Sequence, residues 1–349
     1  MTDIISLLID EPALDALRQA RPQAKENAQE AFEALLEGDL LTAGLRYRLA
    51  LIVAEASGVE PAVAFYRDLV ADEPEVAAPA ALHWAYQLAT RPASANAADI
   101  EELAREGWSP DQVVAMGQLI GFVAFQVRVI HGLRVMFSYE PLRDAVPRGF
   151  EVRTYPGMAR PAHFVSHSLG WRPWVPPAEE LTEEQRAALI KPEREKSEYF
   201  RLLARDPRAL KARTLTDLDI FYNTEGGLGR AERELAATVV SRVNGCVYCA
   251  SVHAGRAIQE SGRREDIERL LSEGVAADLG SAQWNAVRDA ARALTDTPIT
   301  FNISHVRALR EAGLNDTAVV DVINSAAFFQ WANRLMLSLG EPELPRRFR

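Results

Sequence analysis

Helical periodicity covers almost the whole chain and constrains its fold more than any other feature. Apolar residues recur at helical spacing among Ala, Leu, Glu and Arg, and no run of alternating β-branched residues indicates a strand. The chain has 349 residues, 48% of them hydrophobic, which is enough to bury a sizeable core, and this length favours two domains. The sequence therefore predicts an all-α fold.

One segment interrupts this pattern. Eight of the nineteen prolines lie between Pro141 and Pro192, and the stretch from Leu169 to Pro177 cannot form a regular helix. A capping box at residues 182–185 then predicts that a helix restarts. We interpret residues 141–192 as a connector with Trp171 and Trp174 as hydrophobic anchors. The alternative is that these two side chains line a substrate pocket.

The helical pattern repeats on either side of the connector. Ser109 opens an apolar segment that aligns without a gap with the segment opened by Asn315, and Arg128 and Arg334 then occupy matching positions. Upstream, residues 46–58 match residues 233–245 more weakly. In that register the first half has Tyr47, Val59, Ala62 and Tyr66 where the second half has Glu234, Cys246, Cys249 and His253.

We expect a duplicated all-α domain. Residues 1–140 would form a degenerate copy without the thiol site, and residues 193–349 a copy that keeps it. The alternative is that two helical stretches of similar composition align by chance.

The only two cysteines, Cys246 and Cys249, lie within one helical turn. The preceding Asn244-Gly245 is a helix stop, so a new helix is expected to open at the cysteines. The i, i+3 spacing places both sulfur atoms on one face, and His253 follows Cys249 on that face. The dipole at the helix start is expected to lower a thiol pKa and favour the reactive thiolate. This pattern is typical of a redox site.

Twelve residues before Cys246, Glu234 lies in an apolar helical pattern. Glu234, Cys246-x-x-Cys249 and His253 together resemble the active-site pattern of the alkylhydroperoxidase D-like members of the carboxymuconolactone decarboxylase family. Weaker similarity extends over about residues 195–340 and, in degenerate form, through the first half. The stretch Leu169–Trp174 resembles the linker of uncharacterised peroxidase-related members.

The resemblance implies an all-helical fold that oligomerises, with thiol peroxidase or thiol oxidoreductase activity. One position departs from the family pattern. The better-studied members have a histidine directly before the second cysteine, where this chain has Tyr248, a possible accessory residue. A phenol, with a pKa near 10, does not relay protons at neutral pH as imidazole does.

Position and resemblance together suggest a role for each site residue. Cys249, one turn into the helix, would be the nucleophile, and Cys246, at an exposed helix start, the resolving thiol; the reverse assignment stays open. Glu234 would accept a proton, with its pKa raised by its apolar helix. His253 would stabilise the thiolate. The plainer interpretations are a salt-bridged helix carboxylate for Glu234 and a capping or core histidine for His253.

Metal binding is the less favoured interpretation. Cys246, Cys249 and His253 offer three ligands, whereas structural zinc sites use four. His163 and His167 have ligand spacing, but their Pro-rich surroundings favour a linker. We therefore expect neither a metal nor an organic cofactor.

Charge and composition limit the partners. The formal net charge of −10 and the lack of a basic run argue against nucleic-acid binding. The apolar stretch from Leu119 to Phe137 contains polar and charged residues, which favours a buried helix over a membrane span. The start of the chain does not resemble a signal peptide, so we expect a cytoplasmic protein. The expected partners are a peroxide substrate and a dithiol, thioredoxin-type or lipoyl-type reductant.

The leading hypothesis is a thiol-dependent peroxidase or oxidoreductase that reduces organic hydroperoxides. The alternatives are a lactone decarboxylase-like enzyme of the same broad family and a non-enzymatic redox sensor. Because the family's single-domain members form hexamers, a two-domain chain is expected to form a trimer. A dimer is the alternative if the connector and the C-terminal aromatic residues Phe328, Phe329 and Trp331 form the main contact.

Overall fold

A computed structural model describes residues 3–137 and 163–346 and is almost entirely helical, which confirms the predicted all-α class. The part before the connector contains α1 (Ile4–Ile9), α2 (Pro12–Arg18), α3 (Pro22–Leu36), α4 (Ala43–Ser57), α5 (Glu60–Ala71), α6 (Pro79–Thr90), a 3₁₀ turn (Pro92–Ser94), α7 (Ala97–Glu106) and α8 (Pro110–Phe137).

The connector contributes β1 (Gly170–Pro173), α9 (Glu183–Ala188), a 3₁₀ segment (Pro192–Lys196) and α10 (Glu198–Leu203). The remainder contains α11 (Pro207–Tyr222), α12 (Arg230–Asn244), α13 (Val247–Ser261), α14 (Arg264–Glu273), α15 (Ala282–Thr295), α16 (Ile303–Glu311), α17 (Asp316–Ser338) and β2 (Gly340–Glu343). β1 and β2 pair antiparallel, with Trp171 opposite Pro342. These are the only two strands in the described parts of the chain.

The helices of the two halves follow one another in the same order. Helices α3, α4, α5, α6, α7 and α8 match α11, α12, α13, α15, α16 and α17. Helices α4 and α12 each have fifteen residues and end at a left-handed glycine, Gly58 or Gly245. Helix α14 has no counterpart among the described residues of the first half. The order agrees with a duplication, and the boundaries at 140 and 192 stay predictions.

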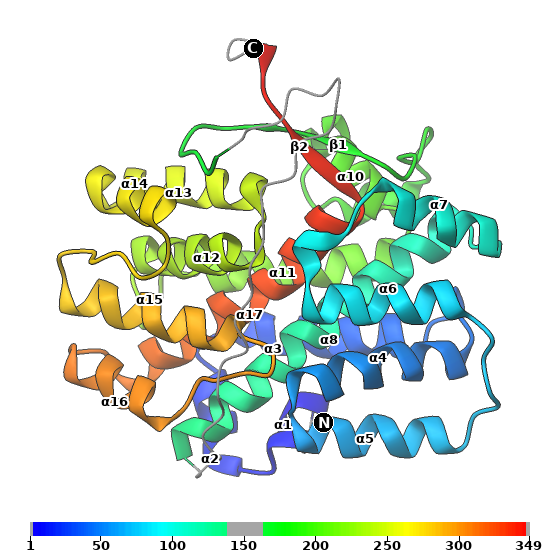
Figure 1. Ribbon diagram of the computed structural model, residues 1–349. Coiled ribbons are helices and arrows are strands. Elements are labelled where there is room, and N and C mark those ends of the chain that lie inside the picture. Colours follow the sequence, from blue (N-terminus) through cyan, green and yellow to red (C-terminus); the bar gives the residue numbers. More distant parts are fainter. Residues whose placement is uncertain (1–2, 138–162, 347–349) are drawn as a thin grey trace.

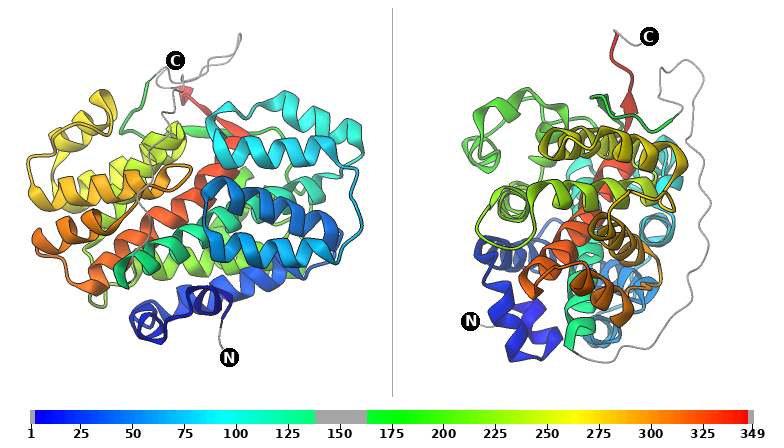
Figure 2. Two further views of the ribbon diagram at one scale, coloured as in Figure 1. Left: turned by 60° about the horizontal axis from the view of Figure 1, so that its bottom comes forward. Right: turned by 90° about the vertical axis from the view of Figure 1, so that its left-hand side faces the viewer.

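Two antiparallel helix pairs join the halves. Helix α8 packs along α17, and α3 packs along α11, with helices α4–α7 on one side of these pairs and α12–α16 on the other (Figure 1). A second view shows α8 and α17 side by side through the middle of the molecule (Figure 2). Gly121 of α8 lies against Trp331 of α17, and Gly132 lies against Ile323. The buried side chains form one continuous core across both halves.

The local signals read from the sequence act as expected at several points. Thr182 and Gln185 form the predicted capping box at the start of α9. Helix α8 is long and apolar enough to cross a membrane, but its apolar window is wholly buried inside the protein, as expected of a core helix.

Trp171 donates a hydrogen bond to the carbonyl oxygen of Met336 and packs edge-on against Tyr199, so it anchors the connector to α17 and α10. Residues 141–162 of the predicted connector lie outside the described part.

Candidate dithiol site

The two thiols lie at the start of α13, as the helix stop at Asn244-Gly245 predicted. Gly245 adopts a left-handed conformation (φ 77°) that ends α12, and Cys246 is the N-cap of α13. Such a φ favours glycine because a side chain would be strained there. Asn244 donates hydrogen bonds to Gln330 and Asn333 of α17, which fixes the turn to the core.

Both thiols are free and buried. Cys246 is 2% exposed and Cys249 is 5% exposed. The expectation that Cys246 is exposed at the helix start was wrong, because side chains of the core cover this end of the helix.

The two thiols interact directly, and this changes the expected acidity of Cys246. Burial raises the pKa of the Cys246 thiol well above its usual value, and a hydrogen bond to Cys249 raises the pKa further. The expected lowering by the helix dipole therefore does not prevail at Cys246, because desolvation of the charged form outweighs it. The raised pKa favours the protonated thiol of Cys246.

Glu234 is fully buried on α12 and holds two partners at once. Its Oε2 lies 2.5 Å from Nδ1 of His253, and its Oε1 accepts a hydrogen bond of 2.6 Å from Nε of Arg230. Burial favours the neutral acid, but His253 and Arg230 outweigh it and hold the pKa of Glu234 below its ordinary value. The expectation of a raised pKa was wrong, because it left out these two partners. Among the described residues its carboxylate is hydrogen-bonded to Arg230 and His253 and not to a sulfur atom.

His253 lies one turn beyond Cys249 on α13, in an aromatic setting. Its ring packs edge-on against Phe329 at 4.2 Å between centroids and lies 6.0 Å from Phe221. Because Glu234 is ionised, Nδ1 carries the proton that is shared with it, and Nε2 is the nitrogen left for other chemistry. The side chain is 20% exposed, so a solute can approach this end of the site.

Tyr248 stands in the first turn of α13 between the two cysteines. It is half-buried, and burial together with the neighbouring thiols raises its pKa to about 12. The phenol is therefore protonated at neutral pH and can act only as a hydrogen-bond donor or a neutral acceptor.

Four further side chains complete the surroundings of the site, and the sequence analysis did not identify them. One is Arg230, described above, and the others are Tyr199, Arg213 and Asp217. Burial raises the pKa of Tyr199, Arg213 opposes this rise, and both thiols add to it. Its buried hydroxyl makes no hydrogen bond to a described residue. Arg213 stacks on Phe328 of α17 at 5.1 Å. Burial raises the pKa of half-buried Asp217, against the opposing fields of Arg213 and His253.

Only one of these four left a signal in the sequence. Arg230 precedes Glu234 by four residues, the spacing of an ion pair on one helix face. Tyr199, Arg213 and Asp217 reach the site from α10 and α11, and no local spacing relates them to the cysteines. Their approach depends on how these helices cross.

In the first half, buried side chains fill the positions that match the dithiol site. Val59, Ala62 and Tyr66 are buried, and the hydroxyl of Tyr66 donates a hydrogen bond of 2.5 Å to Gln126. This half therefore presents packed side chains where the second half has thiols and an imidazole.

Metal ligands do not gather at the site. Within residues 3–137 and 163–346, no group of three or more His, Cys, Asp and Glu side chains is arranged to hold a metal ion. His163 is exposed and His167 half-buried in the loop before β1.

A match to a family model supports the resemblance read from the motif. The model of the carboxymuconolactone decarboxylase family matches residues 207–296, which include Glu234, both cysteines and His253. Among solved structures, an uncharacterized peroxidase-related protein from Silicibacter sp. TM1040 is similar, with 28% sequence identity and a TM-score of 0.39, over 47% of this chain and 89% of that protein. None of the curated proteins matches the chain.

Proposed function

We propose that this chain, whose residues 207–296 match the carboxymuconolactone decarboxylase family, is a thiol-dependent peroxidase that reduces organic hydroperoxides. The observation that carries the proposal is the pair of free, buried thiols at the start of α13, with the hydrogen-bonded His253 and Glu234 on the same and the preceding helix. A structural cysteine pair buried in a core does not require a neighbouring hydrogen-bonded series of imidazole, carboxylate and guanidinium groups. Here His253 of α13 is hydrogen-bonded to Glu234 of α12, which is hydrogen-bonded in turn to Arg230.

In the first step the Cys249 thiolate attacks the terminal oxygen of the hydroperoxide. The S–O bond forms as the O–O bond breaks, and the leaving alkoxide takes a proton to become the alcohol. Cys249 suits this role because it lies one turn from His253 on α13, whereas the raised pKa of Cys246 disfavours the thiolate there. The product is Cys249 sulfenic acid.

In the second step Cys246 resolves the sulfenic acid. Its sulfur attacks the sulfur of Cys249, the S–S bond forms, the S–O bond breaks, and the hydroxyl leaves as water with the proton released by Cys246. An external dithiol then returns two electrons by thiol–disulfide exchange. Both thiols are buried, and His253 is the partly exposed member of the site, so we propose that the reductant approaches from its side.

The hydrogen-bonded side chains of Arg230, Glu234 and His253 set the protonation of the imidazole. Ionised Glu234 holds the Nδ1 proton, so Nε2 can receive a proton from the attacking thiol and return one to the alkoxide. Arg230 keeps Glu234 charged and in place. The buried hydroxyl of Tyr199, which makes no hydrogen bond to a described residue, is a donor for a peroxide oxygen. Tyr248 is a second donor, and neither phenol is needed as a base.

The test is turnover of cumene hydroperoxide with dithiothreitol, dihydrolipoamide or thioredoxin as the reductant. Cys249→Ser is expected to lose activity by roughly 10³-fold, and His253→Gln by about 10²-fold. Arg67→Gln, which changes an exposed arginine on α5, is the control and is expected to keep full activity. Product analysis of the wild type after one equivalent of peroxide should find a Cys246–Cys249 disulfide.

Two other outcomes distinguish the remaining functions. A single oxidation without turnover under all three reductants indicates a redox sensor. Lactone decarboxylation that persists in the Cys246→Ser/Cys249→Ser double variant indicates acid–base chemistry, which requires no thiol. Either result contradicts the proposed peroxidase.

A further inference from the structure

A second site emerges from comparing the two ends of the α3–α11 pair. At the end formed by the start of α3 and the end of α11, Asp321 of α17 lies between two arginines. Its Oδ2 is 2.8 Å from Nη2 of Arg21 and 3.4 Å from Nη2 of Arg233, and it accepts a hydrogen bond from the backbone N–H of Leu228. A buried carboxylate closes this end of the pair.

The opposite end keeps the arginine but lacks the carboxylate. Arg46 matches Arg233 in the repeat, and each donates to a backbone carbonyl five residues earlier, at Leu41 or Leu228. The position of Asp321 is occupied by Ala115, in the register that aligns Ser109 with Asn315. Arg46 therefore has the surroundings of a paired arginine without the acid.

A cavity fills the space that the carboxylate would take. It has a volume of about 210 Å³ and is lined by Arg46, Asp206 and Ala115, with leucines 35, 40 and 41 among its apolar walls. Arg46 is 8% exposed, and its Nε makes no hydrogen bond to any described residue. No carboxylate of the described residues forms an ion pair with it. Because the space far exceeds that of one water molecule, it can hold a small solute.

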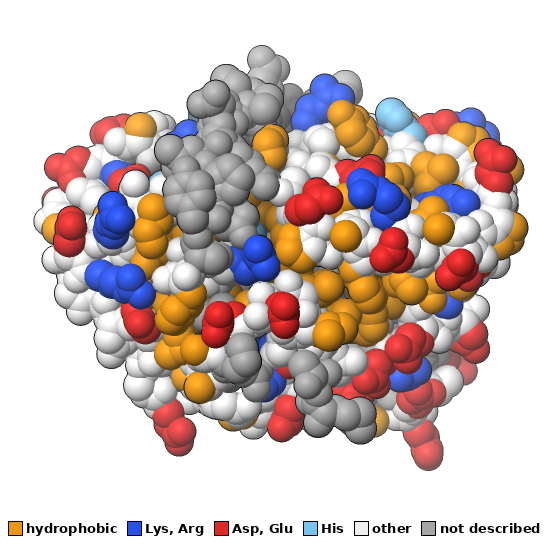
Figure 3. Space-filling model, turned by 90° about the horizontal axis from the view of Figure 1, so that it is seen from below, with side chains coloured by type: hydrophobic (Ala, Val, Ile, Leu, Met, Phe, Trp, Pro, Cys, Tyr) orange, Lys and Arg blue, Asp and Glu red, His pale blue; other side chains and the backbone are white. Residues whose placement is uncertain are grey.

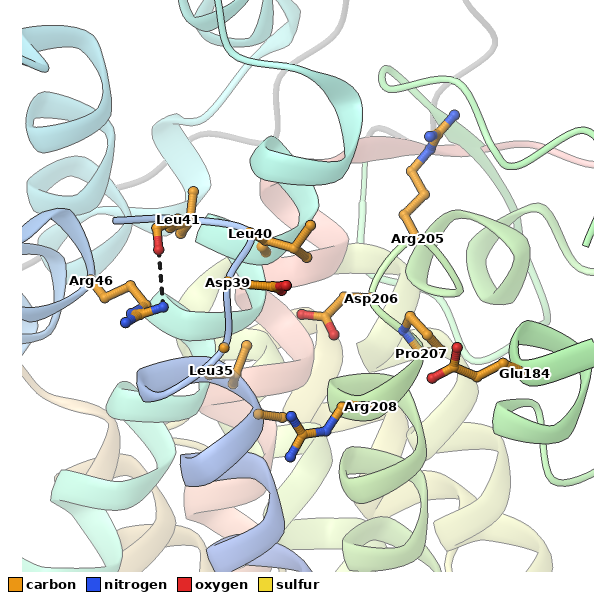
Figure 4. Close-up of a pocket in the computed structure, with 13 residues that line it drawn as sticks. Leu35, Asp39, Leu40, Leu41, Arg46, Glu184, Arg205, Asp206, Pro207 and Arg208 are labelled. Carbon is orange, nitrogen blue, oxygen red and sulfur yellow. Dashed lines mark hydrogen bonds between the residues drawn. The ribbon is translucent and has the colours of Figure 1, made fainter. Parts of the chain in front are cut away.

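Asp206 supplies a second buried charge in the cavity, which exposed Arg208 also lines. Asp206 stands where the other end has Arg21, since each precedes the proline that starts its helix. Asp206 is 6% exposed, and its Oδ1 accepts a hydrogen bond from the N–H of Ala209. Burial raises the pKa of Asp206 to about 6, so it is mostly ionised at neutral pH. Figure 4 shows the carboxylates of Asp39 and Asp206 directed toward one another, with Asp39 at the exposed mouth.

We propose that this cavity binds a small zwitterion of the α-amino acid class, with its carboxylate on Arg46 and its ammonium group on Asp206. The carboxylate replaces the one that Asp321 supplies at the other end, and the backbone N–H of Leu41 matches that of Leu228. The ammonium group then pairs with Asp206, which occupies the position that Arg21 has at the other end. A plain carboxylate would leave Asp206 beside a like charge, and a plain amine would leave Arg46 unpaired. The leucine walls and the modest volume favour a short apolar side chain.

The test is isothermal titration of the full-length protein with glycine, L-alanine and L-valine at neutral pH. At least one of these amino acids should bind. Propionate and ethylamine, each carrying one of the two charges, are expected to bind at least tenfold more weakly. If none of the three amino acids binds, or if propionate binds as tightly as L-alanine, the proposal is overturned.

Two variants locate the binding. Ala115→Asp supplies the missing carboxylate from within the chain, so it should pair with Arg46, raise the melting temperature and abolish binding. Arg46→Gln is expected to weaken binding at least tenfold, while Arg67→Gln, an exposed arginine away from the cavity, leaves it unchanged. If Arg46→Gln does not fold, the result for Ala115→Asp alone decides whether binding occurs in this cavity. Binding that survives in Ala115→Asp contradicts the site.

Discussion

Glu234 shows how much of the site depends on a single residue. Its carboxylate is fully buried and is shared between Arg230 and His253, so both partners depend on one anion. Removing one member of a buried charged network leaves the others without compensation, which costs more than the network contributes as a whole.

We therefore predict that Glu234→Gln lowers the free energy of unfolding by about 2–4 kcal/mol at pH 7. The pKa of Glu234 is lower in the folded protein than its ordinary value of 4.5. Its charge thus contributes stability that is fully present above pH 4.5 and is lost as the pH falls through the lower folded pKa. Urea unfolding at pH 7 and at progressively lower pH should show the difference between wild type and variant shrinking with acid.

The control for this prediction is Glu55→Gln, on the matching helix α4. Glu55 and Arg67 form an ion pair in which both side chains are more than half exposed. Such pairs contribute little, so this change is expected to cost less than about 1 kcal/mol. An equal cost for the two variants would contradict the role assigned to the buried network.

At the scale of helices, the contact between α8 and α17 depends on glycine. A Cβ atom on Gly121 would lie 2.5 Å from Cδ1 and 3.2 Å from the backbone oxygen of Trp331. Alanine gains about 1 kcal/mol of helix propensity over glycine, but forcing the two helices apart costs about 1–3 kcal/mol. We predict that Gly121→Ala destabilises the protein by up to about 2 kcal/mol, measured as the shift in a urea unfolding curve.

Gly117 provides a matched comparison one turn earlier in α8. A Cβ atom there would lie 3.5 Å or more from its neighbours, which is ordinary contact. Gly117→Ala is therefore expected to be neutral or to stabilise the protein through helix propensity alone. If both variants behave alike, the close approach at Trp331 does not constrain the helix pair.

The helices also show what could be predicted from the sequence and what could not. The turn between α12 and α13 was predictable because Asn244-Gly245 is a local signal, and local signals act within a few residues. The burial of Cys246 was not predictable, because it depends on side chains packed from other helices. The same holds for Tyr199 and Asp217, which approach the site from α10 and α11. Spacing along the chain identifies a motif but not what packs against it.

For the whole molecule, the internal packing limits how chains can associate. The pairs α3–α11 and α8–α17 already join the two halves within one chain. Phe328, Phe329 and Trp331 are buried in that core, so they are not available to a second chain, and a dimer cannot use them as its main contact. Large hydrophobic side chains nevertheless remain exposed, among them Leu7, Tyr86, Phe137 and Tyr222.

These exposed side chains favour association through other faces. The face shown in Figure 3 carries a band of hydrophobic side chains between groups of acidic ones, a pattern suited to a contact with a polar rim. We predict a homotrimer, in which each chain takes the place of two single-domain subunits. Static light scattering at micromolar concentration should then give the mass of three 38.6-kDa chains, about 116 kDa. A mass of one chain over a dilution series within the micromolar range would contradict association, and a mass of two would require a contact that excludes the C-terminal aromatic residues.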